Sequence, residues 1–139
     1  VAGRMCFEIT ETAAITNYRH ALEFITQLRK RQCRFALDDF GSGLSSFSYL
    51  KTLHVDFLKI DGRYIAGMLG DAVDEAIVKS IHHIAHVMNI RTIAEYVEDA
   101  RTVDRLKAVG IDYAQGSFFG APQSLETFCT MAAKPAPAA

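Results

Sequence analysis

Five short apolar runs recur along this chain, and each carries charged or amide side chains toward its downstream end. The runs span residues 5–11, 34–39, 55–61, 92–98 and 112–116. A polar group inside such a run costs free energy unless it is paired or bound to a ligand. Because this cost recurs at the same end of successive runs, we expect the run ends to form a functional site.

Segments of helical periodicity separate these runs. Apolar residues recur at helical spacing within 18–28, which is followed by the basic residues 29–31, and again within 76–88. Shorter helices are expected over 45–52 and 100–109, the second with Gly110 as its C-cap, and Ser124 is expected to cap a last helix through about Met131. Strands and helices that alternate in this way predict parallel strands joined by right-handed crossovers.

One polar side chain per run defines five successive βα units. The five are separated by 20 to 36 residues, which leaves room for one helix in each interval: Glu8, Asp38, Lys59, Glu95 and Gln115. In parallel α/β folds functional groups gather where strands end, so these side chains are expected to converge. Lys59 and Asp61 are two residues apart and should point to one face of their strand, while Leu58 and Ile60 pack beneath the helices on the other.

Composition narrows the class of protein. The chain has 139 residues, of which 50% are hydrophobic, and a net charge of −1, so we expect one soluble domain with a real core and no nucleic-acid polymer as partner. No run approaches the roughly 18 apolar residues of a membrane span, and no signal peptide is recognisable. We therefore expect a cytoplasmic location without direct membrane contact. Cys6, Cys33 and Cys129 are expected to be reduced.

Taken together, five short motifs resemble the successive signatures of EAL-domain cyclic di-GMP phosphodiesterases. They cover about residues 5 to 123 and occur in the family's order: Glu8-Ile9-Thr10-Glu11, Asp38-Asp39-Phe40-Gly41-Ser42-Gly43, Lys59-Ile60-Asp61, Glu95-Tyr96-Val97-Glu98 and Gln115-Gly116. The resemblance implies an α/β fold, a modified (β/α)8 TIM-type barrel. It also implies hydrolysis of cyclic di-GMP to linear pGpG with two divalent ions, Mg²⁺ or Mn²⁺.

The resemblance assigns roles to the polar residues. Asp38 would bridge both ions, Asp39 would hold the second, and Glu8 would belong to the first; adjacent carboxylates offer the hard oxygens that such ions prefer. Lys59 and Glu95 would be catalytic. Lys59 would position or deprotonate the attacking water, or stabilise charge on the phosphoryl oxygens, and the sequence does not choose between these roles.

Further residues match the family in supporting positions. Glu98 and Gln115 would orient the far wall of the site, and Asp61 would support the metal site. The segment Phe40, Gly41, Ser42, Gly43 matches a regulatory loop that couples dimer contacts to metal binding, and Glu11 matches the residue that anchors it. Read alone, this glycine-rich segment is weak evidence for a phosphate site, because no Lys-Ser or Lys-Thr follows it.

Taken one at a time, the same residues have structural explanations. The aspartate pair could cap a helix or form a turn, Lys59 could be a buried ion pair with Asp61 or Asp38, and Gln115 could be a structural hydrogen bonder. Glutamates at positions 8, 11, 95 and 98 could be solvated charges. Because all of these residues occur together and in the order of the family, one functional site is favoured over the separate structural explanations.

Two histidines also need an interpretation. His82 and His86 lie one helical turn apart and could share a metal, but the sequence around them offers no Glu after the first histidine and no obvious third ligand. We therefore expect them on a helix flank outside the barrel. For the aromatic residues at positions 18, 24, 35, 47, 49 and 57, core packing is expected rather than base stacking.

The chain is too short for a closed barrel, which takes about 250 residues. We expect residues 1–131 to supply strands four to eight of a partial EAL domain and residues 132–139 to form a disordered tail. The Glu-Ala-Leu segment, the Arg shortly after it and the Asn ligand of the family have no counterpart here, so the two-metal site is incomplete. The upstream part of the same barrel is an expected partner, and the parent protein could be membrane-tethered through upstream domains.

Two expectations follow for the isolated chain. An open sheet leaves two edges and an exposed apolar inner face, which favours a homodimer or other self-association. Without the missing ligands, the chain alone should have negligible phosphodiesterase activity. For the parent protein, the retained Asp38, Asp39 and Lys59 favour an active enzyme over a non-catalytic cyclic di-GMP-binding or protein-interaction module, and over an unrelated α/β-barrel enzyme.

Overall fold

The protein is built on one parallel sheet of five strands, in the order β1-β2-β3-β4-β5. The computed structural model describes residues 2–41 and 47–132. The strands are β1 (Cys6–Thr10), β2 (Arg34–Phe40), β3 (Phe57–Ile60), β4 (Arg91–Ala94) and β5 (Tyr113–Ala114), and every neighbouring pair is parallel. The predicted α/β organisation with sequential parallel strands is therefore confirmed.

Helices connect the strands in sequence order. They are a 3-10 turn η1 (Ala2–Arg4) and the α-helices α1 (Glu11–Thr16), α2 (Tyr18–Arg29), α3 (Leu50–Leu53), α4 (Gly62–Gly67), α5 (Ala72–Val87), α6 (Ala100–Val109) and α7 (Leu125–Ala132). Short polar side chains begin several of them: Asp99 accepts a hydrogen bond from Thr102 N at 2.8 Å, and Ser124 accepts one from Thr127 N at 3.2 Å. Gly110, with φ at 95°, ends α6 as predicted.

Three details of the predicted pattern were wrong. Strand and helix do not alternate one by one, because α1 precedes α2 and α4 precedes α5 between successive strands. The third apolar run, residues 55–61, is longer than the strand it predicted, because β3 ends at Ile60 and Asp61 caps α4 instead. The helix expected over 45–52 is the single turn α3, and residues 42–46 lie outside the described part of the chain. Residues 133–139, most of the predicted tail, also lie outside it.

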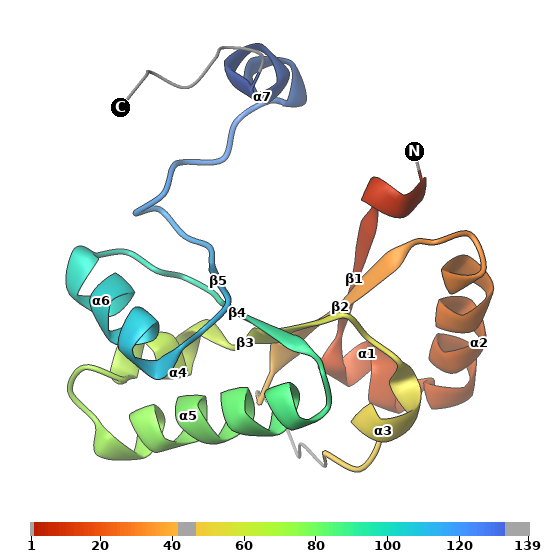
Figure 1. The fold of residues 1–139 in the computed structure, drawn as a ribbon, viewed down its shortest axis with the longest axis horizontal. Helices are drawn as coiled ribbons and strands as arrows, with labels where there is room; N and C mark the ends of the chain where they lie inside the picture. Colours follow the sequence, from red (N-terminus) through yellow and green to blue (C-terminus); the bar gives the residue numbers. More distant parts are fainter. Residues whose placement is uncertain (1, 42–46, 133–139) are drawn as a thin grey trace.

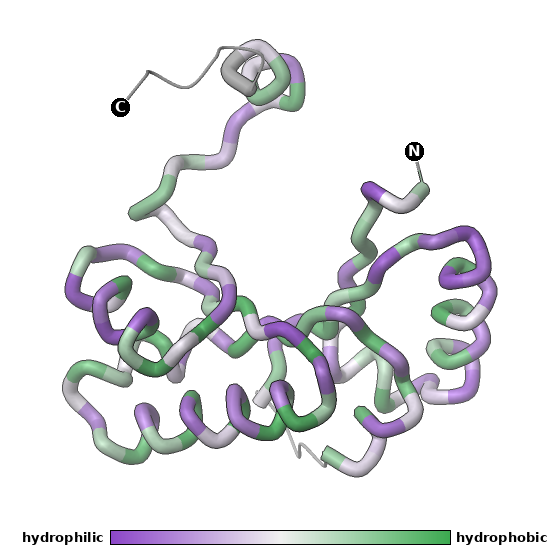
Figure 2. The backbone as a smooth tube through the Cα atoms, viewed as in Figure 1, coloured by the Kyte–Doolittle hydropathy of each residue, from purple (hydrophilic) through white to green (hydrophobic). Residues whose placement is uncertain are grey.

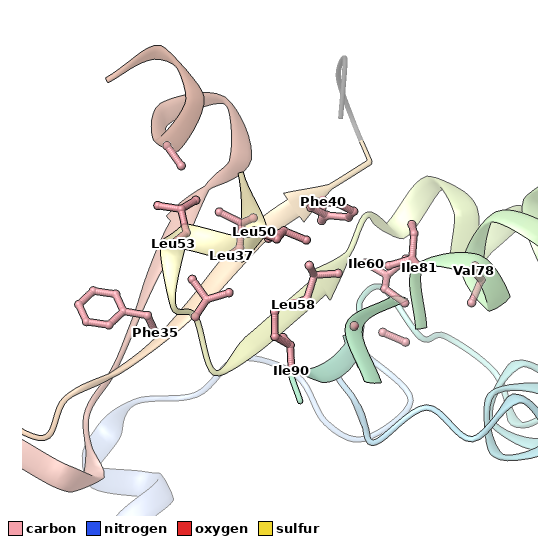
Figure 3. Close-up of a cluster of buried hydrophobic side chains, with 14 of the residues drawn as sticks. Phe35, Leu37, Phe40, Leu50, Leu53, Leu58, Ile60, Val78, Ile81 and Ile90 are labelled. Atoms are coloured by element: carbon pink, nitrogen blue, oxygen red, sulfur yellow. The ribbon is translucent and has the colours of Figure 1, made fainter. Parts of the chain in front are cut away.

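The hydrophobic core lies between one face of the sheet and helices α1 to α6 (Figure 1). Phe35, Leu37 and Phe40 of β2 and Leu58 and Ile60 of β3 are all at most 1% exposed. Figure 3 shows Leu50 and Leu53 of α3 and Val78 and Ile81 of α5 in the same cluster. Purple and green alternate along α2 and α5 in Figure 2, as helices with one buried face require.

The predicted apolar stripes of α2 and α5 need small corrections. Phe24 is 47% exposed, although its ring contacts Phe7 and Phe35 edge to face. Within the predicted range 76–88, Ala76 is exposed, whereas Val78 is fully buried. The three cysteines are free, as predicted.

The opposite face of the sheet is more polar than the apolar inner face that the sequence predicted. Cys6, Glu8, Arg34 and Arg91 are exposed there. The Arg34 guanidinium lies over the Phe57 ring, 5.5 Å from its centroid, and Arg91 Nη1 donates a hydrogen bond of 2.7 Å to the Tyr113 hydroxyl. A cation–π contact and a charge-assisted hydrogen bond thus connect β2 with β3 and β4 with β5 on this face.

Helix α7 stands apart from the other helices, at the end of an extended segment that follows β5 (Figure 1). Its residues Leu125 and Phe128 are 77% and 56% exposed. Within residues 2–41 and 47–132, none of the helices combines the length and apolarity that crossing a bilayer requires.

Gly116 allows the segment after β5 to pass directly over Val97. A Cβ atom at Gly116 would lie 2.2 Å from Val97 O and 2.3 Å from Val97 N, both backbone atoms. We expect Gly116→Ala to lower the free energy of unfolding by about 3 kcal/mol, measured by denaturant titration, because neither backbone can yield cheaply. Gly70→Ala is the control: nothing lies within 4 Å of its Cβ position, and its effect should stay within about 0.5 kcal/mol. Equal effects of the two substitutions would contradict the packing argument.

An ion-pair network fastens α5 to α6. Glu75 Oε1 lies 2.5 Å from Lys79 Nζ and 2.5 Å from Arg105 Nη2, and these hydrogen bonds lower the pKa of Glu75 to about 2 from its ordinary 4.5. A carboxylate with a lowered pKa adds stability above its ordinary pKa and loses it as the pH falls toward the lowered value. Glu75→Gln should therefore lower the melting temperature at pH 7, and the difference from wild type should vanish near pH 2. Glu23→Gln, on the exposed surface of α2, should show no such pH-dependent difference.

Candidate active site

Four of the predicted side chains meet at the downstream ends of β1 to β4. The Lys59 ammonium lies 2.9 Å from Glu8 Oε2, 2.9 Å from Asp38 Oδ1 and 2.9 Å from Glu95 Oε1. Each residue comes from a different strand end, and the parallel register brings these ends to one rim. The predicted convergence is thus present for four of the five side chains.

Lys59 is the centre of this cluster and is only 3% exposed. Burial alone would lower the pKa of its ammonium, but hydrogen bonds to Asp38, Glu95 and Glu8 outweigh burial and raise the pKa above its ordinary value. Lys59 therefore carries a positive charge across the physiological pH range. Of the two ion pairs weighed from the sequence, the one with Asp38 forms, whereas Asp61 pairs with Arg63.

A bulge in β2 brings two adjacent carboxylates to the same side. Leu37 pairs with Leu58 and Phe40 pairs with Ile60, so Asp38 and Asp39 together face the single residue Lys59. In a regular strand adjacent side chains point to opposite faces. Asp39 has φ at 55° in the left-handed region, and its backbone N–H donates to Asp38 Oδ1 at 3.1 Å. The extra residue also returns Phe40 to the core, where it is fully buried.

Glu95 has one carboxylate oxygen that nothing in the described structure satisfies. Oε1 contacts Lys59, while Oε2 is buried and has no hydrogen-bond partner among residues 2–41 and 47–132. Burial raises the pKa of Glu95, and the hydrogen bond and charge of Lys59 act against this rise. A buried carboxylate oxygen without a partner is costly. It fits a position where a cation or a polar ligand group binds.

The described residues contain a suitable ligand set for such a cation. Asp38, Asp39 and Glu95 each offer an oxygen atom, and the three atoms lie within 4.8 Å of one another. Three carboxylates in this arrangement suit a hard divalent cation such as Mg²⁺ or Mn²⁺. Glu8 is not part of this set; its half-exposed carboxylate binds Lys59 instead. Its predicted role as a ligand of a first metal stays a prediction.

Glu11 anchors the backbone at the end of β2. Its side chain is 1% exposed; Oε2 accepts a hydrogen bond from Gly41 N at 3.0 Å, and Oε1 accepts one from the Tyr49 hydroxyl. Burial and this hydrogen bond raise the pKa of Tyr49 above its ordinary value. The Tyr64 hydroxyl donates to Gly41 O at 2.8 Å. Of the predicted regulatory loop, Phe40 and Gly41 are therefore held in place, whereas Ser42 and Gly43 lie outside the described residues.

Two adjoining hollows at this end of the sheet contain the remaining predicted residues. One of about 670 Å³ is lined by Glu95, Glu98, Gln115, Phe119 and Pro122, among others. The other, of about 630 Å³, is lined by Asp39, Asp61, Arg63 and Glu98, among others. Glu98 borders both hollows. Gln115 is thus placed on a wall beside Glu95 rather than at the Lys59 cluster.

Asp61 has a local role that its place in the motif did not reveal. It caps α4 by accepting a hydrogen bond from Arg63 N at 2.8 Å, and its carboxylate pairs with the Arg63 guanidinium at 3.1 Å. The predicted support of a metal site is untested by these contacts.

Sequence reasoning missed Arg63 and Tyr96 as candidate site residues. Both line the hollow beside Asp39. Tyr96 directly follows Glu95, has φ at 54° and is 68% exposed. Non-glycine residues in the left-handed region are uncommon and occur often at functional sites. For Tyr96 the signal is its backbone conformation, which the sequence does not reveal. For Arg63 the sequence does offer a signal, because its position two residues after Asp61 suggests an ion pair.

Comparison with known proteins gives consistent matches. The family model described as "EAL domain" matches residues 1–122. A relative from Shewanella oneidensis named "Cyclic di-GMP phosphodiesterase PdeB" is 51% identical over 125 residues, which are 90% of this chain and 15% of the relative. The chain therefore spans a small part of that relative's length.

Solved structures share the fold. The EAL domain of Mycobacterium smegmatis DcpA matches with a TM-score of 0.85 and 32% identity, over 94% of this chain and 59% of that one. A complex of Klebsiella pneumoniae BlrP1 with manganese and cy-diGMP matches with a TM-score of 0.82 and 30% identity, over 87% of this chain and 31% of that one. These matches confirm the predicted fold class, part of a (β/α)8 TIM-type barrel.

A divalent cation should stabilise the protein through the aspartate pair. We expect Mn²⁺ to raise the melting temperature of the wild type, with about 2.7 kcal/mol of stabilisation at a concentration 100 times Kd. Asp39→Asn should abolish most of this shift, because Asn keeps the left-handed backbone but lacks the charge. Asp104→Asn, on the exposed side of α6, is the control and should keep the full shift. An unchanged shift in Asp39→Asn would contradict the assigned ligand set.

Proposed function

Because the chain belongs to the EAL domain family, we propose that it supplies the C-terminal part of a metal-dependent phosphodiesterase that hydrolyses cyclic di-GMP to linear pGpG. The single observation that supports this most is the cluster around Lys59, in which Asp38, Asp39 and Glu95 lie close together. One carboxylate oxygen of Glu95 is buried there without a hydrogen-bond partner among the described residues. Such a cluster matches the charge and ligand needs of phosphodiester hydrolysis.

We propose that the remaining part of the active site lies in segments outside this chain. The chain spans 15% of its Shewanella relative and 59% and 31% of the two solved structures described above. The activity, substrate and partners of the whole protein are accordingly proposals. We propose that residues from upstream strands complete the two-metal site, and that this chain without them has negligible activity.

Each side chain has a place in the proposed mechanism. Asp38 and Asp39 would hold Mg²⁺ or Mn²⁺, which when bound lowers the pKa of water and neutralises phosphoryl oxygens. Water attacks phosphorus and the bond from phosphorus to the 3′ oxygen breaks, which leaves a 5′-phosphate on the linear product. Glu95 would face the attacking water with its free oxygen. Lys59 would hold Asp38 and Glu95 in position and stabilise the negative charge that develops on the phosphoryl group.

The hollow lined by Glu98, Gln115 and Phe119 is the proposed place for part of the dinucleotide. It adjoins Glu95, contains an amide that can both donate and accept hydrogen bonds, and has an aromatic side chain on its wall. A guanine base offers complementary edge groups and a flat face for such a wall.

One observation favours a second candidate function. Lys59 contacts three carboxylates at hydrogen-bond distance, so its positive charge offsets part of their negative charge. A cluster neutralised in this way could hold the rim in shape in a module that binds cyclic di-GMP or a protein partner without cleaving it. Homodimerisation and the cytoplasmic location stay predictions under both functions.

Turnover by the intact protein separates the two candidates. Lys59→Met should lower kcat for cyclic di-GMP about 10² to 10³-fold, because it removes a fixed positive charge from the reacting phosphoryl group. Lys107→Met, an exposed lysine on α6, should leave kcat unchanged. Since removing Lys59 leaves carboxylates uncompensated, circular dichroism must show a native fold, and Lys59→Arg offers a charge-preserving variant.

The possible outcomes are distinct. A folded Lys59→Met variant with wild-type kcat would contradict the proposed mechanism. Binding of cyclic di-GMP by the intact wild type with no turnover in Mg²⁺ or Mn²⁺ would favour the binding module.

A further inference from the structure

A second group of potential metal ligands lies away from the candidate active site. His82 and His86 lie one turn apart on α5, and Asp112 lies immediately before β5. Each of the three offers one ligand atom, and these atoms lie within 4.8 Å of one another. The sequence alone offered the histidine pair but no third ligand, because Asp112 follows His86 by 26 residues. The fold of β4 and β5 brings it back to α5.

The group lies at the other end of the sheet from the Lys59 cluster. Asp112 precedes β5, whereas Gln115 follows it. The candidate active site residues lie between the middle of their strands and the segments that follow the downstream ends, and the two groups share no residue. A role for this group is therefore independent of the proposed phosphodiesterase.

A buried threonine orients two of the three side chains. Thr92 Oγ1 lies 2.8 Å from His82 Nδ1 and donates to Asp112 Oδ2 at 3.0 Å, and Thr92 N donates to the same oxygen at 2.8 Å. Thr92 itself is fully buried. Hydrogen bonds of this kind hold metal-ligating side chains in a fixed orientation and select the histidine tautomer. With Nδ1 engaged, His82 keeps Nε2 free.

The two remaining side chains are already close and accessible. His86 Nε2 lies 3.0 Å from Asp112 Oδ2, and the His86 side chain is 49% exposed. The rings of His82 and His86 have centroids 4.1 Å apart. An ion from solvent can reach the group without a rearrangement of the core.

We propose that His82, His86 and Asp112 form a binding site for a divalent transition metal of the Zn²⁺ class, with water in the remaining coordination position. Two imidazoles and one carboxylate suit Zn²⁺ and Co²⁺, whereas Mg²⁺ prefers oxygen ligands alone. The bound ion would connect α5 directly to the start of β5, the strand that leads to Gln115.

Zn²⁺ titration of the intact protein tests this site. The protein is freed of metal with a chelator and titrated calorimetrically with Zn²⁺ in excess Mg²⁺, which occupies hard-oxygen sites. We expect wild type to bind one more Zn²⁺ than His86→Ala. His83→Ala is the matched control, because His83 is exposed on the same helix and contributes no ligand to the group. It should bind as many Zn²⁺ ions as wild type.

A second, more conservative variant, His86→Gln, distinguishes loss of the metal site from misfolding of His86→Ala. His86→Gln keeps a hydrogen-bond donor toward Asp112, and its Zn²⁺ affinity at this site should be about tenfold weaker or more. Co²⁺ serves as a spectroscopic probe: the visible absorption of low-coordinate Co²⁺ should appear in wild type and His83→Ala and be absent from His86→Gln. Equal Zn²⁺ stoichiometry and affinity in wild type, His86→Ala and His86→Gln would overturn the proposal, as would an equal loss in His83→Ala.

Discussion

One buried ammonium group sets the geometry of the whole rim. Lys59 is 3% exposed, and a charge so far from water is tolerated only with partners close by. Its partners Glu8, Asp38 and Glu95 come from the ends of three other strands, all at 2.9 Å. Removing one partner of such a buried group costs about 3–5 kcal/mol. The ends of β1, β2 and β4 are therefore held around β3 by the same contacts that gather the candidate catalytic side chains.

The backbone adds a second constraint at the same place. Asp39 and Tyr96 take left-handed conformations directly after Asp38 and Glu95, and β2 carries an extra residue opposite Lys59. Conformations of this kind are unfavourable for non-glycine residues and persist where the surroundings enforce them. At Asp39 the core enforces this conformation, because fully buried Phe40 returns to the apolar side only if the bulge is present. Packing on one face thus positions carboxylates on the other.

Sequence reasoning recovered the parts of this design that depend on periodicity. The five strands, the long helices α2, α5 and α6 and the polar residues at the strand ends all follow from spacing of 2 or 3.6 residues. The helices α1 and α4 were missed because each is a short element of six residues without a clear stripe. The bulge at Asp38 and Asp39 and the approach of Asp112 to His86 depend on tertiary contacts. No local pattern encodes such contacts.

Arg34 and Arg91 restrict which surfaces can pack on the face of the sheet that the helices do not cover. Both project beside aromatic rings, with Arg34 over Phe57 and Arg91 on the Tyr113 hydroxyl. A flat apolar face would stack on any similar surface, whereas inward-pointing charges oppose indiscriminate stacking of sheets. Covering a guanidinium without acceptors is costly. A segment that covers this face at low cost must therefore present oxygen atoms opposite β2 and β4, where the two guanidinium groups lie.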